Sequence, residues 1–312
     1  MNHVDPRALR TVVLVHAHPD DETLWTGGLI AQLARQGDTR IVVVTCTRGE
    51  RGEVITAPGT ATEDKGWLFG NHEALAEHRI NELKAALAAL GNGYPIEHYF
   101  LDELPLPDGG QVSELPVPSV EEGFTPSRNH GTRETVRYVD SGMRWLVEPS
   151  VEGDDPRTST GGVAEPDPEA ADGFATAPLD DAAACLAGLL NDLEGNINLV
   201  TYEADGGYGH PDHVRAHAVA VRALEMTGPA ASGRNLELWE VTKPGEPYDV
   251  AVPVTAVLPK LLAAMRAYAS QVQGVTEDVD PAAGRVGWFA LSNGVPLAIK
   301  DHEYYRVTPF RS

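Results

Sequence analysis

The first hundred residues alternate between short apolar runs and longer amphipathic stretches. Thr11–Ala17 (TVVLVHA) and Arg40–Cys46 (RIVVVTC) are almost continuously apolar, as expected of strands that are covered on both faces. Apolar residues recur at helical spacing in Glu22–Gln36 and Glu73–Leu90, and a further strand is predicted at Ile96–Leu101. This order predicts right-handed crossovers and an α/β fold, in which helices flank a Rossmann-like, mostly parallel sheet.

The alternation stops between about residues 102 and 177, where Pro, Gly and acidic residues dominate. A stretch of this length without a lasting period is typical of a lid, a binding loop or a disordered insertion. The α/β pattern then returns, with helices predicted at Leu179–Leu193 and His213–Met226 and strands at Asn198–Tyr202 and Leu236–Val241. We therefore expect a long loop insertion within one α/β domain.

The C-terminal part of the chain has a weaker pattern. A helix is predicted at Thr255–Ser270, and two short β-like runs, WFALS and HEYYRV, follow it. We expect a Rossmann-like domain over residues 1–242, and a smaller C-terminal α/β part over residues 243–312 that packs on it.

Net charge narrows the range of partners. The chain has 46 acidic residues against 24 basic ones, which gives a net charge of −22 at pH 7. Such a surface repels nucleic acid and anionic membranes, and it suits a protein that acts on a small molecule. An acidic proteome or a halotolerant host accounts for the charge equally well.

Several features indicate a cytoplasmic protein. The N-terminal MNHVDPRALR has no apolar stretch typical of a signal peptide, and no run reaches the roughly 18 apolar residues that span a bilayer. Cys46 lies in a predicted strand and Cys185 in a predicted helix, so we expect both to be reduced core residues.

The turn after the first strand carries the run His18-Pro19-Asp20-Asp21-Glu22. It places an imidazole and three carboxylates at the carboxyl end of a strand, where open α/β sheets bind their ligands. Carboxylates this close repel one another unless a positive charge joins them, and a divalent cation is the simplest candidate. The run therefore predicts a metal site.

A second run, YGHPDH at 208–213, follows another apolar strand and supplies further imidazoles. We expect His18, Asp21 and His213 to bind one Zn²⁺ ion per chain, because two imidazoles and one carboxylate leave positions open for water and substrate. Asp20 can then take a proton from the water. His210 can protonate a departing nitrogen or stabilise an oxyanion, with Tyr208 as a further donor.

Other roles for these residues stay open. Asp20 or Asp21 can simply cap the helix that follows the turn. His217 lies four residues after His213, so it can compete as a ligand, although packing along the helix is the simpler role.

Two other classes of protein also fit part of the pattern. His18 and Asp20 with a distant His match the facial triad of non-haem Fe(II) oxygenases, which commonly occurs on folds rich in strands. A Rossmann binding module without chemistry is the second alternative, but no G-x-G-x-x-G follows the first strand. Gly27-Gly28 lies inside the predicted helix, where small residues ease helix packing.

Taken together, the motifs resemble those of the LmbE-type (PIG-L-like) zinc N-deacetylases. The most specific matches are HAHPDDE at 16–22, VVVTCTRGERGEV at 42–54 and GGYGHPDH at 206–213. Weaker matches are HRINELKAAL at 78–87, DSGM at 140–143, YASQV at 268–272, ALSN at 290–293 and DHEYY at 301–305. The resemblance covers most of the chain and implies that residues 1–242 form the catalytic domain of a metal-dependent amidohydrolase.

Within this family the chain looks most like the enzymes of mycothiol biosynthesis that deacetylate N-acetyl-glucosaminyl-inositol, a small amino-sugar substrate. The resemblance implies the same zinc ligands, base and acid as above, and it allows Fe²⁺ in place of Zn²⁺. It further implies that Glu53, Arg79 and Asp140 hold the sugar and inositol hydroxyls. A mycothiol S-conjugate amidase, or another amino-sugar deacetylase of the family, is the main alternative.

Overall fold

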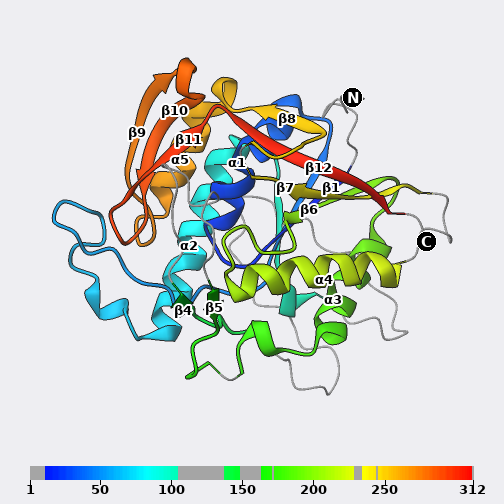
Figure 1. Cartoon of the computed structure of the whole chain (residues 1–312), viewed down its shortest axis with the longest axis horizontal. Helices are drawn as coiled ribbons and strands as arrows, with labels where there is room; N and C mark the ends of the chain where they lie inside the picture. Colours follow the sequence, from blue (N-terminus) through cyan, green and yellow to red (C-terminus); the bar gives the residue numbers. More distant parts are fainter. Residues whose placement is uncertain are drawn as a thin grey trace.

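The computed structural model describes residues 11–104, 137–147, 163–170, 172–227, 234–243 and 245–310. Within them, seven strands form a central sheet in the order β3-β2-β1-β6-β7-β12-β8 (Figure 1). In that order they are β3 (Glu97–Phe100), β2 (Arg40–Thr45), β1 (Thr11–His16), β6 (Ile197–Tyr202), β7 (Leu236–Val241), β12 (His302–Phe310) and β8 (Val250–Pro253). The first five run parallel, and β12 is antiparallel to both of its neighbours. The predicted α/β fold with a mostly parallel sheet is confirmed.

Helices cover both faces of this sheet. Among the described residues they are α1 (Asp21–Gln36), α2 (His72–Gly91), α3 (Leu179–Asp192), α4 (Pro211–Thr227) and α5 (Leu258–Ala267). Helices α1, α2 and α5 pack against one another, whereas α3 packs on α4, and Figure 1 shows this pair below the sheet. The groups lie on opposite faces because the chain steps from β1 to β3 in one direction and from β6 to β7 in the other, with right-handed crossovers.

Two glycines let α1 pack closely against the C-terminal part of the chain. A Cβ atom on Gly27 would lie 2.6 Å from Leu261 of α5, and one on Gly28 would lie 2.7 Å from the carboxylate of Glu303 on β12. That carboxylate accepts the backbone N–H groups of Gly28 and Leu29 at 2.6 and 2.8 Å. The Gly-Gly pair therefore serves helix packing.

The C-terminal part contributes to two sheets. Strands β8 and β12 extend the central sheet, and β9 (Gln273–Asp280), β10 (Arg285–Ala290) and β11 (Pro296–Lys300) form a separate antiparallel sheet. The predicted helix over Thr255–Ser270 is shorter in the structure, where a 3₁₀ turn (Thr255–Val257) leads into α5. The division of the chain at residue 242 stays a prediction.

Part of the expected loop insertion is ordered into a small hairpin. Strand β4 (Arg144–Val147) pairs with β5 (Val163–Glu165), and 3₁₀ turns lie at Leu101–Glu103 and Phe174–Thr176. Strands this short carry too few residues for a period to be recognised in the sequence. Residues 105–136, 148–162 and 171 of the insertion lie outside the described residues.

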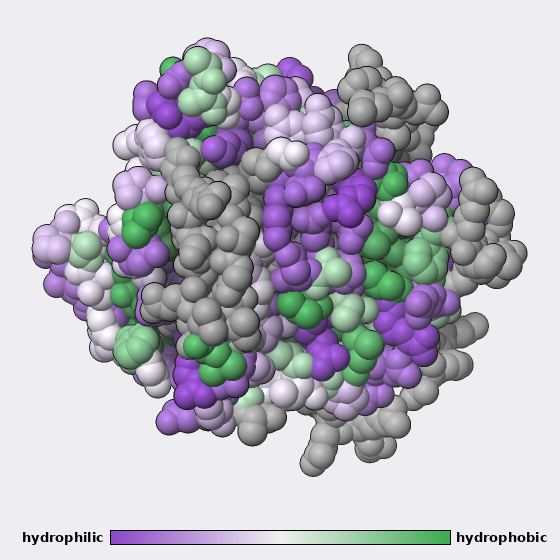
Figure 2. Space-filling view, in the orientation of Figure 1, coloured by the Kyte–Doolittle hydropathy of each residue, from purple (hydrophilic) through white to green (hydrophobic). Residues whose placement is uncertain are grey.

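The surface and the cysteines agree with the composition of the chain. Hydrophilic residues, in purple, predominate on the face drawn in Figure 2, and smaller hydrophobic areas interrupt them. No helix in the described parts of the chain combines the length and the apolar character of a membrane span. Cys46 and Cys185 are both buried and unpaired.

Candidate active site

The two predicted clusters meet because their strands are neighbours. β1 and β6 pair in parallel, from Thr11 opposite Ile197 onward, and the chain leaves them toward opposite faces of the sheet. Ligands bind at such a switch point in open α/β sheets, since the two outgoing turns diverge and leave a crevice. The β1–α1 turn carries His18 to Asp21, and the β6–α4 turn carries Tyr208 to His213.

The three predicted metal ligands converge between these turns. Oδ2 of Asp21 lies 3.2 Å from Nδ1 of His18 and 3.3 Å from Nε2 of His213. The Asp21 carboxylate also accepts the backbone N–H of His18 at 2.9 Å, which fixes its orientation. None of the three side chains lies in open solvent, because each residue is buried.

The ring nitrogens indicate that these residues fit a metal ion. Nδ1 of His213 hydrogen-bonds the carbonyl of Gly206 at 3.1 Å, but its buried Nε2 makes no hydrogen bond of good geometry, although Asp21 is near. Nε2 of His18 lies 3.2 Å from the Asp212 carboxylate, so Nδ1 is left to face Asp21. Such outer partners commonly orient imidazoles that bind metals. The donor set therefore suits a divalent cation.

Further side chains lie within ligand distance. Ligand atoms of His18, His210 and His213 are within 4.8 Å of one another, and so are those of His18, Asp140 and Asp212. Nδ1 of His210 already accepts the N–H of Asp212 at 3.1 Å, and Asp212 is bonded to His18. His210 and Asp212 are thus hydrogen-bonded within the protein, whereas Nε2 of His213 is not and remains available to a metal ion. We therefore keep His18, Asp21 and His213 as the proposed ligands.

Asp20 lies beside the ligands in a strained backbone conformation, with φ of +98°. Its N–H donates to the Glu22 carboxylate at 3.2 Å, and its own carboxylate accepts from Arg79 at 3.2 Å. Arg79 also donates to the carbonyls of Pro19 at 2.5 Å and Gly49 at 2.7 Å. Arg79 and Glu22 therefore hold the strained turn in place.

The pKa values of the two adjacent carboxyl groups in this turn are shifted in opposite directions. Burial raises the pKa of Asp20 to about 8, against the opposing charge of Arg79 and with help from ionised Asp21. Burial opposes ionisation of Asp21 as well, but the imidazoles of His213 and His18 hold the pKa of Asp21 well below its usual range. Asp21 is thus a permanent anion suited to a cation, whereas Asp20 can exchange a proton near neutral pH.

His210 and Tyr208 supply hydrogen-bond donors from the second turn. Burial, together with His18 and His213, holds the pKa of His210 well below its usual range, so its imidazole is neutral. Because its Nδ1 accepts from Asp212, its proton is on Nε2. Burial also raises the pKa of Tyr208 well above its usual range, which keeps the hydroxyl protonated. Both groups line the cavity described next.

A cavity of about 510 Å³ opens onto these groups, and the predicted sugar-binding residues Glu53, Arg79 and Asp140 all line it. Glu53 is exposed, whereas Arg79 and Asp140 are buried. Arg79 contacts Asp20, and a carboxylate oxygen of Asp140 lies 3.7 Å from Nε2 of His18. These two residues therefore also support the catalytic groups, and their role in sugar binding stays a prediction.

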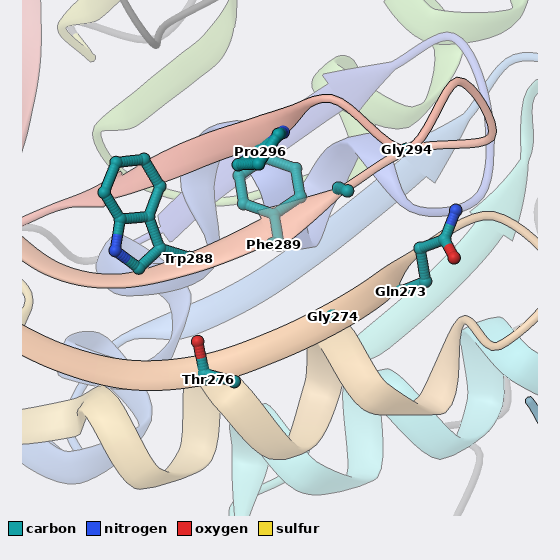
Figure 3. Close-up of a pocket in the computed structure, with 8 residues that line it drawn as sticks. Gln273, Gly274, Thr276, Trp288, Phe289, Gly294 and Pro296 are labelled. Atoms are coloured by element: carbon teal, nitrogen blue, oxygen red, sulfur yellow. The ribbon is translucent and has the colours of Figure 1, made fainter. Parts of the chain in front are cut away.

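A second hollow of about 600 Å³ lies on the antiparallel sheet of β9, β10 and β11 (Figure 3). Its lining residues are Gln273, Gly274, Thr276, Trp288, Phe289, Ala290, Gly294 and Pro296. None of these side chains can act as an acid, a base or a strong metal ligand at neutral pH. The first cavity is therefore the candidate active site.

Two aromatic residues at the site were not predicted as functional. Tyr202 stacks on the imidazole of His213, and Trp25 meets that imidazole edge-on with ring centroids 6.0 Å apart. In the sequence both look like core residues, because nothing local shows which imidazole they touch. The competing ligand His217 is instead paired with Glu240 at 3.0 Å.

Comparisons with known proteins point to one family. The family model for GlcNAc-PI de-N-acetylase (PIG-L) matches residues 13–224. A Kineococcus radiotolerans protein named 1D-myo-inositol 2-acetamido-2-deoxy-alpha-D-glucopyranoside deacetylase is 34% identical, over 96% of this chain and 77% of that protein. A Saccharopolyspora erythraea protein with the same name, numbered 1, is 33% identical over 94% and 88% of the respective chains.

A solved structure supports the fold. N,N'-diacetylchitobiose deacetylase from Pyrococcus horikoshii superposes with a TM-score of 0.52, over 99% of this chain and 88% of that one. Sequence identity is only 15%, so the likeness concerns the fold alone.

Proposed function

The chain belongs to the GlcNAc-PI de-N-acetylase (PIG-L) family, and from this premise we propose that it hydrolyses the acetamide of N-acetyl-glucosaminyl-inositol in mycothiol biosynthesis. The observation that carries the proposal is the convergence of His18, Asp21 and His213 beside Asp20 and His210, at the mouth between β1 and β6. An N-deacetylase needs these groups together, whereas a binding module does not. The parallel, helix-flanked sheet also argues against an Fe(II) oxygenase.

The ligand set proposed above would hold the metal, and Zn²⁺ is our choice because two imidazoles with one carboxylate are one of its common catalytic ligand sets. When bound there, the metal supplies Lewis-acid chemistry, in which water becomes more acidic and the amide carbonyl more electrophilic. Fe²⁺ fits the same donors. Adding Zn²⁺, Fe²⁺ or Co²⁺ back to chelator-treated protein, with activity as the readout, decides between them.

The remaining steps are proton transfers by the chain's own residues. Asp20 takes a proton from the attacking water and passes it to the departing nitrogen, so that acetate and a free amine result. Nε2–H of His210 donates to the carbonyl oxygen as negative charge grows on it, and the hydroxyl of Tyr208 is placed to do the same. Arg79 holds the carboxylate of Asp20 in position for both transfers.

We propose that Glu53 and Asp140 bind hydroxyls of the sugar or the inositol. Arg79, which also contacts the base Asp20, contributes to the same binding. Remote contacts of this kind position the substrate and affect kcat as well as KM. Asp140→Ala should therefore reduce turnover of the glucosaminyl-inositol substrate more than that of bare N-acetylglucosamine.

One assay tests the function directly. Purified protein is given N-acetyl-glucosaminyl-inositol and, separately, a mycothiol S-conjugate, and the two kcat/KM values are compared. We expect the acetylated substrate to be preferred. A clear preference for the conjugate would replace the substrate with that of an amidase, and no hydrolysis of either would overturn the proposal.

We also propose a cytoplasmic location. Two buried, unpaired cysteines suit a reducing compartment, and fusion of the chain to a fluorescent protein in its host would test this.

A further inference from the structure

The metal ligands come from turns that are far apart in the sequence, so their relative position must be fixed by tertiary contacts. One side chain outside both turns contacts each of them. This is Tyr202, the last residue of β6, which is completely buried.

The ring of Tyr202 lies flat on the imidazole of His213. Their centroids are 4.2 Å apart and their planes differ by 9°. The stack fixes the plane of the imidazole, and the hydrogen bond between Nδ1 and the Gly206 carbonyl fixes its rotation within that plane. Together the two contacts leave Nε2 with a single direction, toward Asp21.

The hydroxyl of Tyr202 reaches the other turn. It accepts the backbone N–H of Ala17, the residue directly before His18, at 2.9 Å. This hydrogen bond ties the end of β6 to the backbone from which the first ligand projects.

Tyr202 is itself held rigidly. The rings of His16 and Trp25 each meet it edge-on, with centroids 5.4 Å away. A side chain that is clamped in this way can fix both turns relative to β6.

We propose that Tyr202 is a positioning residue for the metal centre, which fixes the backbone before His18 through its hydroxyl and orients His213 through its ring. The inference rests on the metal-dependent function proposed above, but it does not depend on which substrate is used. According to this proposal, one buried tyrosine fixes the position of the two ligand-bearing turns relative to each other.

The experiment measures the Zn²⁺ dissociation constant by competition with a chromogenic chelator at fixed pH. Tyr202→Phe removes the hydroxyl and keeps the ring. It should weaken Zn²⁺ binding by about 10-fold, the lower end of the effect of losing an outer partner, because the hydroxyl acts on His18 through the backbone of Ala17. Tyr202→Leu removes both contacts and should weaken binding further. If the Leu variant does not fold, the Phe variant alone decides.

Tyr305→Phe is the matched control. Tyr305 is equally buried in the same sheet, and its hydroxyl donates to Glu303 at 2.7 Å. Zn²⁺ affinity should be unchanged in this variant. With chelator present, both Phe variants should lose similar thermal stability, but only Tyr202→Phe should regain less of it on addition of Zn²⁺.

The Co²⁺-substituted protein gives an independent readout, since the visible absorption of Co²⁺ reports its ligands. We expect the bands to shift in Tyr202→Phe and not in Tyr305→Phe. Parent-like affinity and spectrum in Tyr202→Phe would overturn the positioning role and leave the proposed function standing. Weakened Zn²⁺ binding in a protein that hydrolyses no amide would support the positioning role and sink the function.

Discussion

The two turns that carry the candidate metal ligands are held in place by different interactions. The β1–α1 turn depends on charged groups, since Asp20 is fixed by Glu22 and Arg79. The β6–α4 turn is built from glycines, and Gly206, Gly207 and Gly209 all have positive φ values. Close packing against aromatic rings supports these glycines, beside an ion pair between Asp205 and Lys243 at 2.5 Å.

This difference predicts how each turn responds to change. A turn held by titratable groups should be sensitive to pH and to neutral substitutions that preserve shape. A turn held by glycines and ring stacking should be more sensitive to added volume than to pH. Both turns supply a ligand, so loss of either should have the same effect on the metal.

The largest effect should come from removing one ligand from each turn. Asp21→Ala and His213→Ala should each abolish tight metal binding. kcat/KM should then fall by about 10³-fold or more, because metal catalysis contributes several kcal/mol to transition-state stabilisation. Elemental analysis and steady-state kinetics provide the check. Full metal content in the double variant would show that the ligands are misassigned.

The next largest effects should come from removing the base, Asp20, and the oxyanion donor, His210. Asp20→Asn removes a charge from the first turn with little change in shape, and kcat should fall by about 10²–10⁴-fold while the metal stays bound. His210→Ala should reduce kcat by about 10²–10³-fold through loss of a donor from the second turn. Near-normal kcat for Asp20→Asn would leave Glu22 or Asp212 as the base.

The pH dependence of the metal-free protein tests the charge of the first turn. The pKa of Asp20 is raised, mainly by burial, from 3.8 to about 8. The folded state therefore binds a proton that the unfolded chain releases, and this contribution to stability declines as pH rises from about 4 to about 8. Asp20→Asn cannot ionise, so its stability relative to the parent should increase across that range.

Thermal unfolding in excess chelator, at about pH 5 and about pH 8, measures this difference. The second turn offers a control, because Gly209→Ala changes no charge, and its effect on Tm should be the same at both pH values. A difference between parent and Asp20→Asn that does not vary with pH would contradict the burial argument.

Added volume should affect the second turn. Gly207 and Gly209 have φ values of +81° and +90°, so alanine at either position costs about 1–2 kcal/mol of backbone strain. A Cβ atom on Gly207 would lie 2.3 Å from the ring of Trp25, whereas nothing lies within 4 Å of one on Gly209. Gly207→Ala should lose about 1–3 kcal/mol more, because of overpacking. Equal losses in urea unfolding would rule out the contact with Trp25 as the reason for glycine.

The smallest effect is expected at His217, which lies on α4 beyond the turn and pairs with Glu240. His217→Gln should leave metal content unchanged and alter stability by at most about 1 kcal/mol, as for other partly exposed pairs. Loss of metal in this variant would make His217 a ligand after all.

Most of the fold follows from local patterns in the sequence. The long buried strands and the helices α1 to α4 are visible as apolar runs and helical periods, because burial on both faces or on one face imposes those patterns. The strands β4, β5, β8, β9 and β11 were missed. The helix predicted over Thr255–Ser270 ends early in the structure, where Tyr268 leaves α5 and its hydroxyl donates to Glu22 at 2.7 Å.

The candidate site shows the same limit. Clustered imidazoles and carboxylates at two strand ends predict a metal centre from sequence alone, since few other structures tolerate so many like charges. The part played by Arg79 beneath Asp20 was not predicted, because the two residues lie on different elements and meet only after α1 and α2 pack together.

The sequence by itself determined the α/β alternation, the two ligand-bearing turns and the chemical character of the residues in them, because these depend on local spacing and on side-chain type. Tertiary structure alone decided that β1 and β6 are neighbours and that Tyr202 stacks on His213. It also decided that burial separates the proton affinities of Asp20 and Asp21. Each of these depends on which distant segments exclude water from the same point, and that is a property of the packed chain.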